Sequence, residues 1–319
     1  MILITGGAGF IGSNIVNFFA ENYDFKVVSV DYKNELNSVY FKKHDIVKIH
    51  PEKINSFLKN NLKEIVSVIH LGAITSTTEK NVQLIIKNNL ELSLFLWKWC
   101  LKNKKRFIYA SSAATYGDGS NNFNDLETSD YLSKLNPLNL YGWSKHLFDR
   151  FITKQKRNPV QCVGLKFFNV YGPNEFHKSH MRSIILKIFQ TISKNNYVKL
   201  FKSHNPNYRD GEQMRDFIYI KDVVKIINFF FENKNINGLF NVGTGIPRSF
   251  NDLANAVFKN TNKKNNIQYI ATPKNIRDQY QYFTKANLTK LRKVGYKESF
   301  FSLEDGIEDY IKNFLIKGA

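Results

Sequence analysis

The stretch TGGAGFIGSN, residues 5–14, decides the fold of this chain. A short apolar run precedes it, and from Phe10 onward apolar residues recur at helical spacing, so the stretch lies between a buried strand and a helix. Its pattern G-x-x-G-x-x-G is formed by Gly6, Gly9 and Gly12. Such glycines allow a tight turn, the approach of a phosphate to the backbone and close packing of helix on strand. A pyrophosphate at this helix N-terminus would meet unpaired N–H groups and the positive end of the helix dipole.

An acidic residue downstream strengthens this interpretation. The strand-like run of residues 26–30 ends at Asp31, whose carboxylate can accept hydrogen bonds from an adenosine ribose. A glycine pattern alone also matches ordinary structural turns. The combination of strand, glycines, helix and acidic residue is typical of dinucleotide-binding sites, and the sequence therefore predicts a bound dinucleotide.

Length and composition limit the classes of protein that fit. The 319 residues are enough for one large α/β domain with a smaller region attached. The first strand begins at residue 2, so we expect no signal peptide, and no apolar run is long enough to span a membrane. Cys100 and Cys162 match no metal or redox spacing, which favours reduced thiols in a cytoplasmic protein.

The strongly basic composition does not by itself indicate a nucleic-acid-binding protein. The net charge is +19 and the pI is about 9.6. The lysines are scattered among Asn and Ile residues, and the sequence has no arginine-rich arm, RNP-like motif or zinc finger. We therefore expect no specific nucleic-acid partner, and a positive field that also suits an anionic nucleotide.

Strand-like and helix-like segments alternate through the first half of the chain. Predicted strands cover residues 2–5, 26–31, 65–71, 106–111 and 160–168, and predicted helices cover 10–22, about 80–102 and 141–156. The alternation predicts an α/β fold with a Rossmann-type, doubly wound parallel sheet.

The pattern of predicted secondary structure changes near residue 170, after which loops and short elements dominate. Helices are predicted at about 181–195, 221–233, 249–260 and 302–316. We predict an NAD(P)-binding Rossmann domain over residues 1–169 and a smaller, mainly substrate-binding domain over 170–319, with some segments returning to the Rossmann core.

Catalytic chemistry is indicated by the segment YGWSK, residues 141–145. On a helix, Tyr141 and Lys145 share a face. A lysine and a cationic nicotinamide near the phenol favour the phenolate, which could remove a proton from a sugar hydroxyl. A single Y-x-x-x-K is a weak signal in a chain with 16 tyrosines, but Ser111 and Ser112 end the preceding predicted strand and can bring a hydroxyl to the same edge.

Together, TGGAGFIG, Asp31, HLGA (70–73), NN (88–89), SSAATYG (111–117), YGWSK and FFNVYGP (167–173) resemble the extended short-chain dehydrogenase/reductase superfamily over nearly the whole chain. The segments NVYGPNEFHKSHM, RDFIYIKDVV and FNVGTG are similar to the ADP-L-glycero-D-manno-heptose 6-epimerase family. The resemblance implies an isomerase that oxidises C6 of ADP-D-glycero-β-D-manno-heptose transiently and reduces it again from the other face, for precursors of the lipopolysaccharide inner core.

The resemblance also implies roles for individual positions. Ser112, Tyr141 and Lys145 match the catalytic triad, and Lys178 matches a second acid/base. The positions that match cofactor contacts are Gly6, Gly9, Phe10, Ile11, Gly12, Asp31, Tyr32, Leu71, Gly72, Ala73, Asn88, Tyr141, Lys145 and Val170. The positions that match substrate contacts are Ser112, Asn169, His180, Phe201, Arg215 and Tyr280.

Several of these residues have simpler interpretations. Lys178 could be one more solvated lysine, although a lysine with a pKa lowered by desolvation would serve the sugar face that Tyr141 cannot reach. Arg215 suits a diphosphate, but could instead pair with the adjacent Asp216. Tyr280 could contact the nucleotide sugar or belong to the core. His177 and His180 have no acidic or cysteine partners in the sequence pattern, so we assign no metal.

The substrate and the cofactor each leave an alternative. Ser179 and His180 depart from the family's HKG pattern, and residues 202–214 are longer than in the family, which keeps a nucleotide-sugar 4-epimerase open. A non-catalytic nucleotide- or RNA-binding member of the fold is a further alternative. Asp31 favours NAD, whereas the resemblance and the nearby Lys33, Lys42 and Lys43 favour NADP. The resemblance also implies a homo-oligomer, a pentamer.

Overall fold

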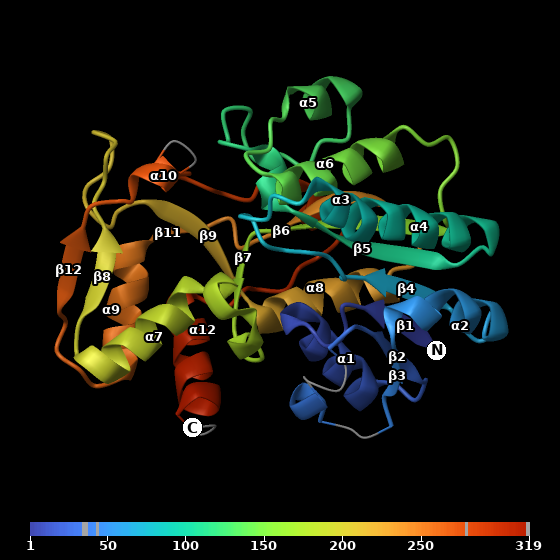
Figure 1. Ribbon diagram of the computed structural model, residues 1–319, viewed down its shortest axis with the longest axis horizontal. Coiled ribbons are helices and arrows are strands. Elements are labelled where there is room, and N and C mark those ends of the chain that lie inside the picture. Colours follow the sequence, from blue (N-terminus) through green and yellow to red (C-terminus); the bar gives the residue numbers. More distant parts are fainter. Residues whose placement is uncertain (34–37, 43–44, 278–279, 317–319) are drawn as a thin grey trace. The chain divides into compact units, whose positions relative to one another are not determined.

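The computed structural model describes residues 1–33, 38–42, 45–277 and 280–316, drawn in Figure 1. The chain divides into two compact units, each assembled from separate parts of the sequence. Unit 1 comprises Met1–Gly117, Asp125–Phe167 and Val224–Asn241; unit 2 comprises Asp118–Asn124, Phe168–Val223 and Val242–Ala319.

A seven-stranded sheet forms the centre of unit 1, in the order β10-β6-β5-β4-β1-β2-β3. These strands are β1 (Ile2–Thr5), β2 (Val27–Val30), β3 (Val47–Ile49), β4 (Ser67–His70), β5 (Arg106–Ser112), β6 (Gln161–Phe167) and β10 (Gly238–Val242). The pairs from β3 to β6 are all parallel. Because β1 pairs with β2 on one side and with β4 on the other, the strand order reverses there, which is where ligands bind in such sheets.

Helices cover both faces of this sheet (Figure 1). On one face, α2 (Ile54–Asn60), α4 (Leu92–Lys102) and α6 (Leu140–Thr153) contribute Leu58, Trp97 and Phe148 to a core with Leu3 and Phe107. On the other face, α1 (Phe10–Asn22) and α8 (Ile220–Glu232) meet through Phe19 and Phe231, whose ring centroids are 4.9 Å apart. The short helices α3 (Val82–Ile85) and α5 (Ser129–Lys134) complete unit 1. The predicted Rossmann-type fold is confirmed.

Unit 2 has two small sheets and a group of helices. β9 (Met214–Tyr219) pairs in parallel with β7 (Asn169–Tyr171) and antiparallel with β11 (Pro247–Ser249), and β8 (Val198–Phe201) pairs in parallel with β12 (Ile267–Ile270). The helices are α7 (Ile184–Asn195), α9 (Phe250–Asn260), α10 (Lys274–Arg277), α11 (Thr289–Lys293) and α12 (Leu303–Tyr310).

The predicted elements agree with the structure where the sequence pattern is strong. All five predicted strands and the helix at 10–22 are present within about two residues of their predicted ends. The predicted helix at 80–102 is interrupted, because residues 86–91 between α3 and α4 are π-helical. Helix α7 begins at Ile184, three residues later than predicted, because the Ser183 side chain caps it by accepting from Leu186 N. The short strands of unit 2 were not predicted.

Across the described ranges, no helix has the length and the apolar content that crossing a membrane requires.

The first turn of α1 packs closely against the glycine turn that precedes it. Gly9 is the N-cap of α1 and offers no side chain to its first-turn N–H groups. A Cβ atom on Gly12 would lie 1.9 Å from the carbonyl oxygen of Gly6, and Gly6 itself has φ +68°, in the region that favours glycine. The turn therefore tolerates no side chain where helix and turn meet.

We expect Gly12→Ala to lower the free energy of unfolding by about 3 kcal/mol, because neither backbone can move without opening the turn. Urea denaturation measures the change. Asn22→Ala is the matched control at the other end of α1, where an exposed side chain donates to Phe18 O, and should change stability by less than about 0.5 kcal/mol. Wild-type stability of Gly12→Ala would contradict the close packing.

Candidate active site

The glycine turn is joined to the end of β2 through Asp31. One carboxylate oxygen of Asp31 accepts from Ala8 N at 3.2 Å, and the other accepts from Lys33 N at 2.9 Å. The carboxylate thus lies beside the turn, where the sequence predicts a ribose contact. Tyr32, also predicted to contact the cofactor, is exposed. Of the lysines considered for a 2′-phosphate, Lys42 pairs with Glu21 at 3.2 Å, and Lys43 lies outside the described residues.

A chain of buried hydrogen bonds holds Leu71–Ala73 next to the glycine turn. Gly72 N donates to Thr5 Oγ1 at 3.1 Å, and Thr5 Oγ1 lies 2.6 Å from Nδ1 of His70. The other ring nitrogen of His70 lies 2.8 Å from Ser93 Oγ, which donates its proton to Asn89 O at 2.6 Å. Ser93 therefore accepts from His70, so Nε2 carries the imidazole proton and Nδ1 accepts from Thr5. Burial lowers the pKa of His70 to about 3, which keeps the ring neutral.

Asn89 extends this network to the helix that carries the predicted catalytic residues. Its side chain accepts from Ile74 N at 2.8 Å and donates to Ile74 O and to Ser144 Oγ, both at 3.0 Å. Ser144 in turn donates to the carbonyl of Tyr141 at 2.7 Å. The π-helical segment contains both asparagines, but Asn89 is buried, whereas the amide of the partly exposed Asn88 donates to Leu84 O at 2.9 Å. The sequence motif NN contained Asn89 without revealing this role.

Ser112, Tyr141 and Lys145 all belong to unit 1, at the end of β5 and on α6. Ser112 Oγ accepts from Ala114 N at 3.1 Å and lies close enough to the Tyr141 side chain to affect its pKa. Burial raises the pKa of Tyr141, and the nearby Ser112 hydroxyl lowers it in part. Burial also lowers the pKa of Lys145 to about 8. The structure thus brings the predicted triad together; the roles of its members stay predictions.

Beneath this triad lies an ion pair that the sequence analysis missed. Lys166 on β6 and Asp149 on α6 are both fully buried, with Nζ and Oδ2 2.6 Å apart. The signal in the sequence was a lysine inside the apolar run of residues 160–168, where a buried parallel strand normally excludes charge.

Lys178 lies in unit 2, in the 3-10 segment Phe176–Met181. Burial lowers the pKa of its ammonium, and the carboxylate of Glu175 raises it in part. Glu175 is buried and accepts from Gly172 N, from the backbone N–H and hydroxyl of Ser183, and from Tyr310 Oη. These contacts fix the segment around Lys178, so this residue is not one more freely solvated lysine.

The two departures from the family pattern lie next to Lys178. Ser179 has φ +50° and ψ −121°, a backbone conformation that favours glycine. The serine thus adopts a conformation suited to the glycine of the HKG pattern, at a cost on the order of 1–3 kcal/mol of backbone strain. The side chain of His180 lies outside the described residues.

Among the predicted substrate residues of unit 2, Arg215 has the clearest environment. Its guanidinium donates to Met214 O and Gln281 O and lies 5.5 Å from the ring of Tyr280, which is itself 6.2 Å from the ring of Phe201. Burial lowers the pKa of Arg215 to about 10. Asn169, another residue of this set, lies on β7 together with Val170, which was predicted to contact the cofactor.

The alternative pairing of Arg215 with Asp216 is wrong. The Asp216 carboxylate accepts from Thr244 N, Thr244 Oγ1, Gly245 N and Ala286 N at 2.7–2.9 Å. These four donors occupy the Asp216 carboxylate, whereas the Arg215 guanidinium donates to two backbone carbonyls. Elsewhere, the described part of the chain has no group of three or more His, Cys, Asp or Glu side chains that could hold a metal ion.

Comparison with known proteins agrees with this geometry. Residues 2–243 match the NAD dependent epimerase/dehydratase family. The chain belongs to this family. Among relatives, it is 42% identical to the ADP-L-glycero-D-manno-heptose-6-epimerase of Fusobacterium nucleatum, over 99% of this chain and 98% of that protein. The enzyme of the same name from Brachyspira hyodysenteriae is 41% identical, over 97% and 96%.

Solved structures show the same epimerase/dehydratase fold. The ADP-L-glycero-D-manno-heptose-6-epimerase of Helicobacter pylori superimposes with a TM-score of 0.77 at 32% identity, covering 97% of this chain and 94% of that one. A UDP-N-acetylglucosamine 4-epimerase from Methanobrevibacter ruminantium superimposes with a TM-score of 0.81 at 24% identity, covering 99% and 98%. The second likeness is one of fold.

We expect Asn89→Ala to lower the free energy of unfolding by about 3 kcal/mol, because it leaves buried backbone groups of Ile74 without partners. Asn88→Ala is the matched control, since it loses a single bond at a partly exposed position and should cost less than about 0.5 kcal/mol. Thermal unfolding of both variants tests the difference. Equal stabilities would show that Asn89 does not join the 72–74 segment to α6.

Proposed function

We propose that this chain converts ADP-D-glycero-β-D-manno-heptose to ADP-L-glycero-β-D-manno-heptose, with transient oxidation at C6 of the heptose. The observation that carries the proposal is the placement of Ser112 near the Tyr141 side chain, with buried Lys145 one turn further along α6, in a chain 42% identical over nearly its full length to an epimerase of this name. The resemblance places the product among precursors of the lipopolysaccharide inner core.

The residues around the glycine turn fit a nicotinamide dinucleotide. A glycine N-cap, a turn that tolerates no side chain and a carboxylate beside it are what a pyrophosphate and a ribose require. Gly6, Gly9 and Gly12 would hold the pyrophosphate, Asp31 the ribose, and Lys145 the nicotinamide ribose. A bound nicotinamide would supply reversible hydride transfer at the sugar carbon, so that the reaction has no net redox change.

Tyr141 handles the proton of the sugar hydroxyl on one face. Because burial raises its pKa, the phenol needs partners that favour its anion. The nearby Ser112 hydroxyl is one such partner, since it lowers the pKa of Tyr141 in part, and the positive charge of a bound nicotinamide would be another. Lys145 is held at a pKa of about 8, so it can change protonation state near neutral pH.

Lys178 serves the opposite face of the same carbon. Hydride return to the other face requires a proton from a side that Tyr141 cannot reach, and a lysine with a lowered pKa can exchange one. The carboxylate of Glu175 favours the protonated form of this lysine, so the group can recover its proton after each transfer.

Arg215 contacts the diphosphate and the neighbouring aromatic rings contact the nucleotide. A buried guanidinium held by two backbone carbonyls is oriented before an anion arrives, and its planar fork matches phosphate oxygens. Phe201 and Tyr280 offer ring faces to the base or the sugar.

The cofactor is NADP, with NAD as the alternative. Lys33 is held beside Asp31, since its backbone N–H donates to the Asp31 carboxylate, and a nearby ammonium can neutralise a 2′-phosphate. Isothermal titration of the cofactor-free protein with both nucleotides distinguishes them. The cytoplasmic location and the pentamer stay predictions from sequence.

The reaction is tested by mixing the purified protein with ADP-D-glycero-β-D-manno-heptose, without added cofactor, and following the C6 proton of the sugar by NMR. Conversion to a mixture of both epimers supports the proposal and shows that the cofactor stays bound. If no conversion occurs even with NADP or NAD, while UDP- or GDP-hexoses react, the protein is a different epimerase of the family.

We expect Tyr141→Phe to lower kcat by about 10³-fold, because the variant keeps the ring but loses the proton-transfer group. Cofactor retention and thermal stability should match the wild type. Tyr131→Phe, the same change on α5, is the control and should keep full activity. A fully active Tyr141→Phe would remove Tyr141 from the mechanism.

We expect Lys178→Met to lower kcat by about 100-fold with normal folding, because one face of the carbon loses its acid/base group. Lys194→Met, which removes an exposed lysine from α7, is the control. Turnover is measured by the same NMR assay. Wild-type activity of Lys178→Met would assign the second proton to another group.

A further inference from the structure

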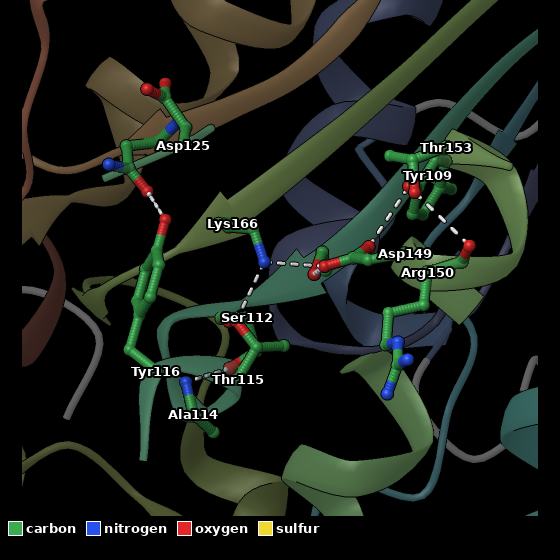
Figure 2. Close-up of polar contacts among 12 residues, drawn as sticks. Tyr109, Ser112, Ala114, Thr115, Tyr116, Asp125, Asp149, Arg150, Thr153 and Lys166 are labelled. Carbon is green, nitrogen blue, oxygen red and sulfur yellow. Dashed lines mark hydrogen bonds and ion pairs between the residues drawn. The ribbon is translucent and has the colours of Figure 1, made fainter. Parts of the chain in front are cut away.

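The buried pair Lys166–Asp149 lies at the centre of a polar network inside unit 1 (Figure 2). Asp149 accepts from Lys166 Nζ at 2.6 Å, from Ser111 Oγ at 2.7 Å and from Tyr109 Oη at 3.0 Å. Lys166 also donates to Thr115 Oγ1 at 2.8 Å. Figure 2 shows the Lys166 ammonium between the Asp149 carboxylate and Thr115.

Such a pair is not the most stable way to fill an interior. Removing two charges from water costs several kcal/mol per ion, and well-packed apolar residues often stabilise a fold equally well or better. Here each charge is satisfied by further hydrogen bonds, which specify one arrangement of the surrounding elements. Stability alone therefore does not account for the pair.

The network includes residues on both sides of Ser112 in the sequence. Ser111, directly before it, donates to Asp149. Thr115, three residues after it, accepts from Lys166 and donates to the carbonyl of Ser112 at 2.8 Å. Ser112 is thereby held from both sides at the point where β5 leads into the 3-10 turn Ala113–Tyr116.

The same network is attached to the catalytic face of α6. Asp149 lies one helical turn beyond Lys145 and two turns beyond Tyr141, so the three side chains share a face. Its carboxylate raises the pKa values of both Tyr141 and Lys145, and the positive charge of Lys166 opposes that field. The opposing charges of Asp149 and Lys166 therefore both affect the pKa values of the two predicted catalytic groups.

We propose that Lys166 and Asp149 are positioning residues for the reaction proposed above: they hold Ser112 against the Tyr141 face of α6, and Lys166 neutralises the carboxylate beneath that face. Neither residue contacts the reacting atoms. This inference rests on the proposed function only in one respect, since the turnover assay that tests it uses the proposed substrate.

The titratable and charged groups around the pair come from every element packed against it. They are His70 on β4, Tyr109 on β5, Tyr116 in the 3-10 turn Ala113–Tyr116, Asp125 and Glu127 before α5, Tyr131 on α5, and Tyr141, Lys145, His146 and Arg150 on α6. His70 and His146 have pKa values of about 3 and 4, and burial raises the pKa values of Tyr109 and Tyr116. Tyr141 and Lys145 are thus the groups of this set whose pKa values the pair can shift toward the pH at which the enzyme works.

The test compares Lys166→Met, Asp149→Asn and the double variant by the pH dependence of kcat. Loss of Lys166 leaves a negative charge near Tyr141 and should move the profile to higher pH by about one unit; loss of the Asp149 charge should move it to lower pH by a similar amount. The double variant should return toward the wild-type profile. Each single variant should also lose at least about tenfold in kcat with KM within about threefold, because Ser112 is displaced.

Arg150→Met is the matched control, since it removes one positive charge from the neighbouring position of α6, where the side chain is partly exposed and screened by solvent. It should leave the profile unchanged. Shifts of the two single variants in the same direction, or unshifted profiles in folded variants, would overturn the proposal.

A second readout needs no substrate. In protein labelled with ¹³C-tyrosine, the Tyr141 signal is assigned by its absence in Tyr141→Phe, and its titration is followed by NMR in each variant. Opposite shifts in the two single variants support the inference even if the wild type does not convert ADP-heptose, an outcome that rejects only the proposed function. An active wild type whose Tyr141 titration is the same in all variants rejects only the inference.

Discussion

Helix α6 is fixed to the sheet of unit 1 by buried hydrogen bonds at two levels. Near its start, Ser144 accepts from Asn89; one turn beyond Lys145, Asp149 accepts from β5 and β6. Because these groups are cut off from water, each must keep its partner or lose about 1–3 kcal/mol. The axial and rotational position of α6 is therefore closely specified, and with it the positions of Tyr141 and Lys145.

The same burial that fixes the helix sets its electrostatics. Desolvation opposes charge on both predicted catalytic groups, so it raises the pKa of Tyr141 and lowers that of Lys145. Without a bound ligand, both groups favour their neutral forms more than they would in water. The Ser112 hydroxyl opposes this effect at Tyr141, since it lowers the pKa of the phenol in part.

The sequence predicted the parts of the molecule whose interacting residues lie close together in the chain. The glycine turn, Asp31 and Y-x-x-x-K each place their residues within one strand, turn or helix, and the buried parallel strands have long apolar runs. Lys166 with Asp149 and Glu175 with Tyr310 are different, because their partners are 17 and 135 residues apart and only the folded chain joins them. The strands of unit 2 have three to six residues, too short for a two-residue alternation to stand out.

Tyr310, at the end of α12, donates to Glu175, and Glu175 in turn holds the segment in which Ser179 keeps its left-handed backbone. A strained peptide persists only while its surroundings outweigh the strain. The last long helix of the chain is thus a structural support for Lys178. A change at Tyr310, 132 residues after Lys178 in the chain, would therefore reach the segment that carries this lysine through the Glu175 carboxylate.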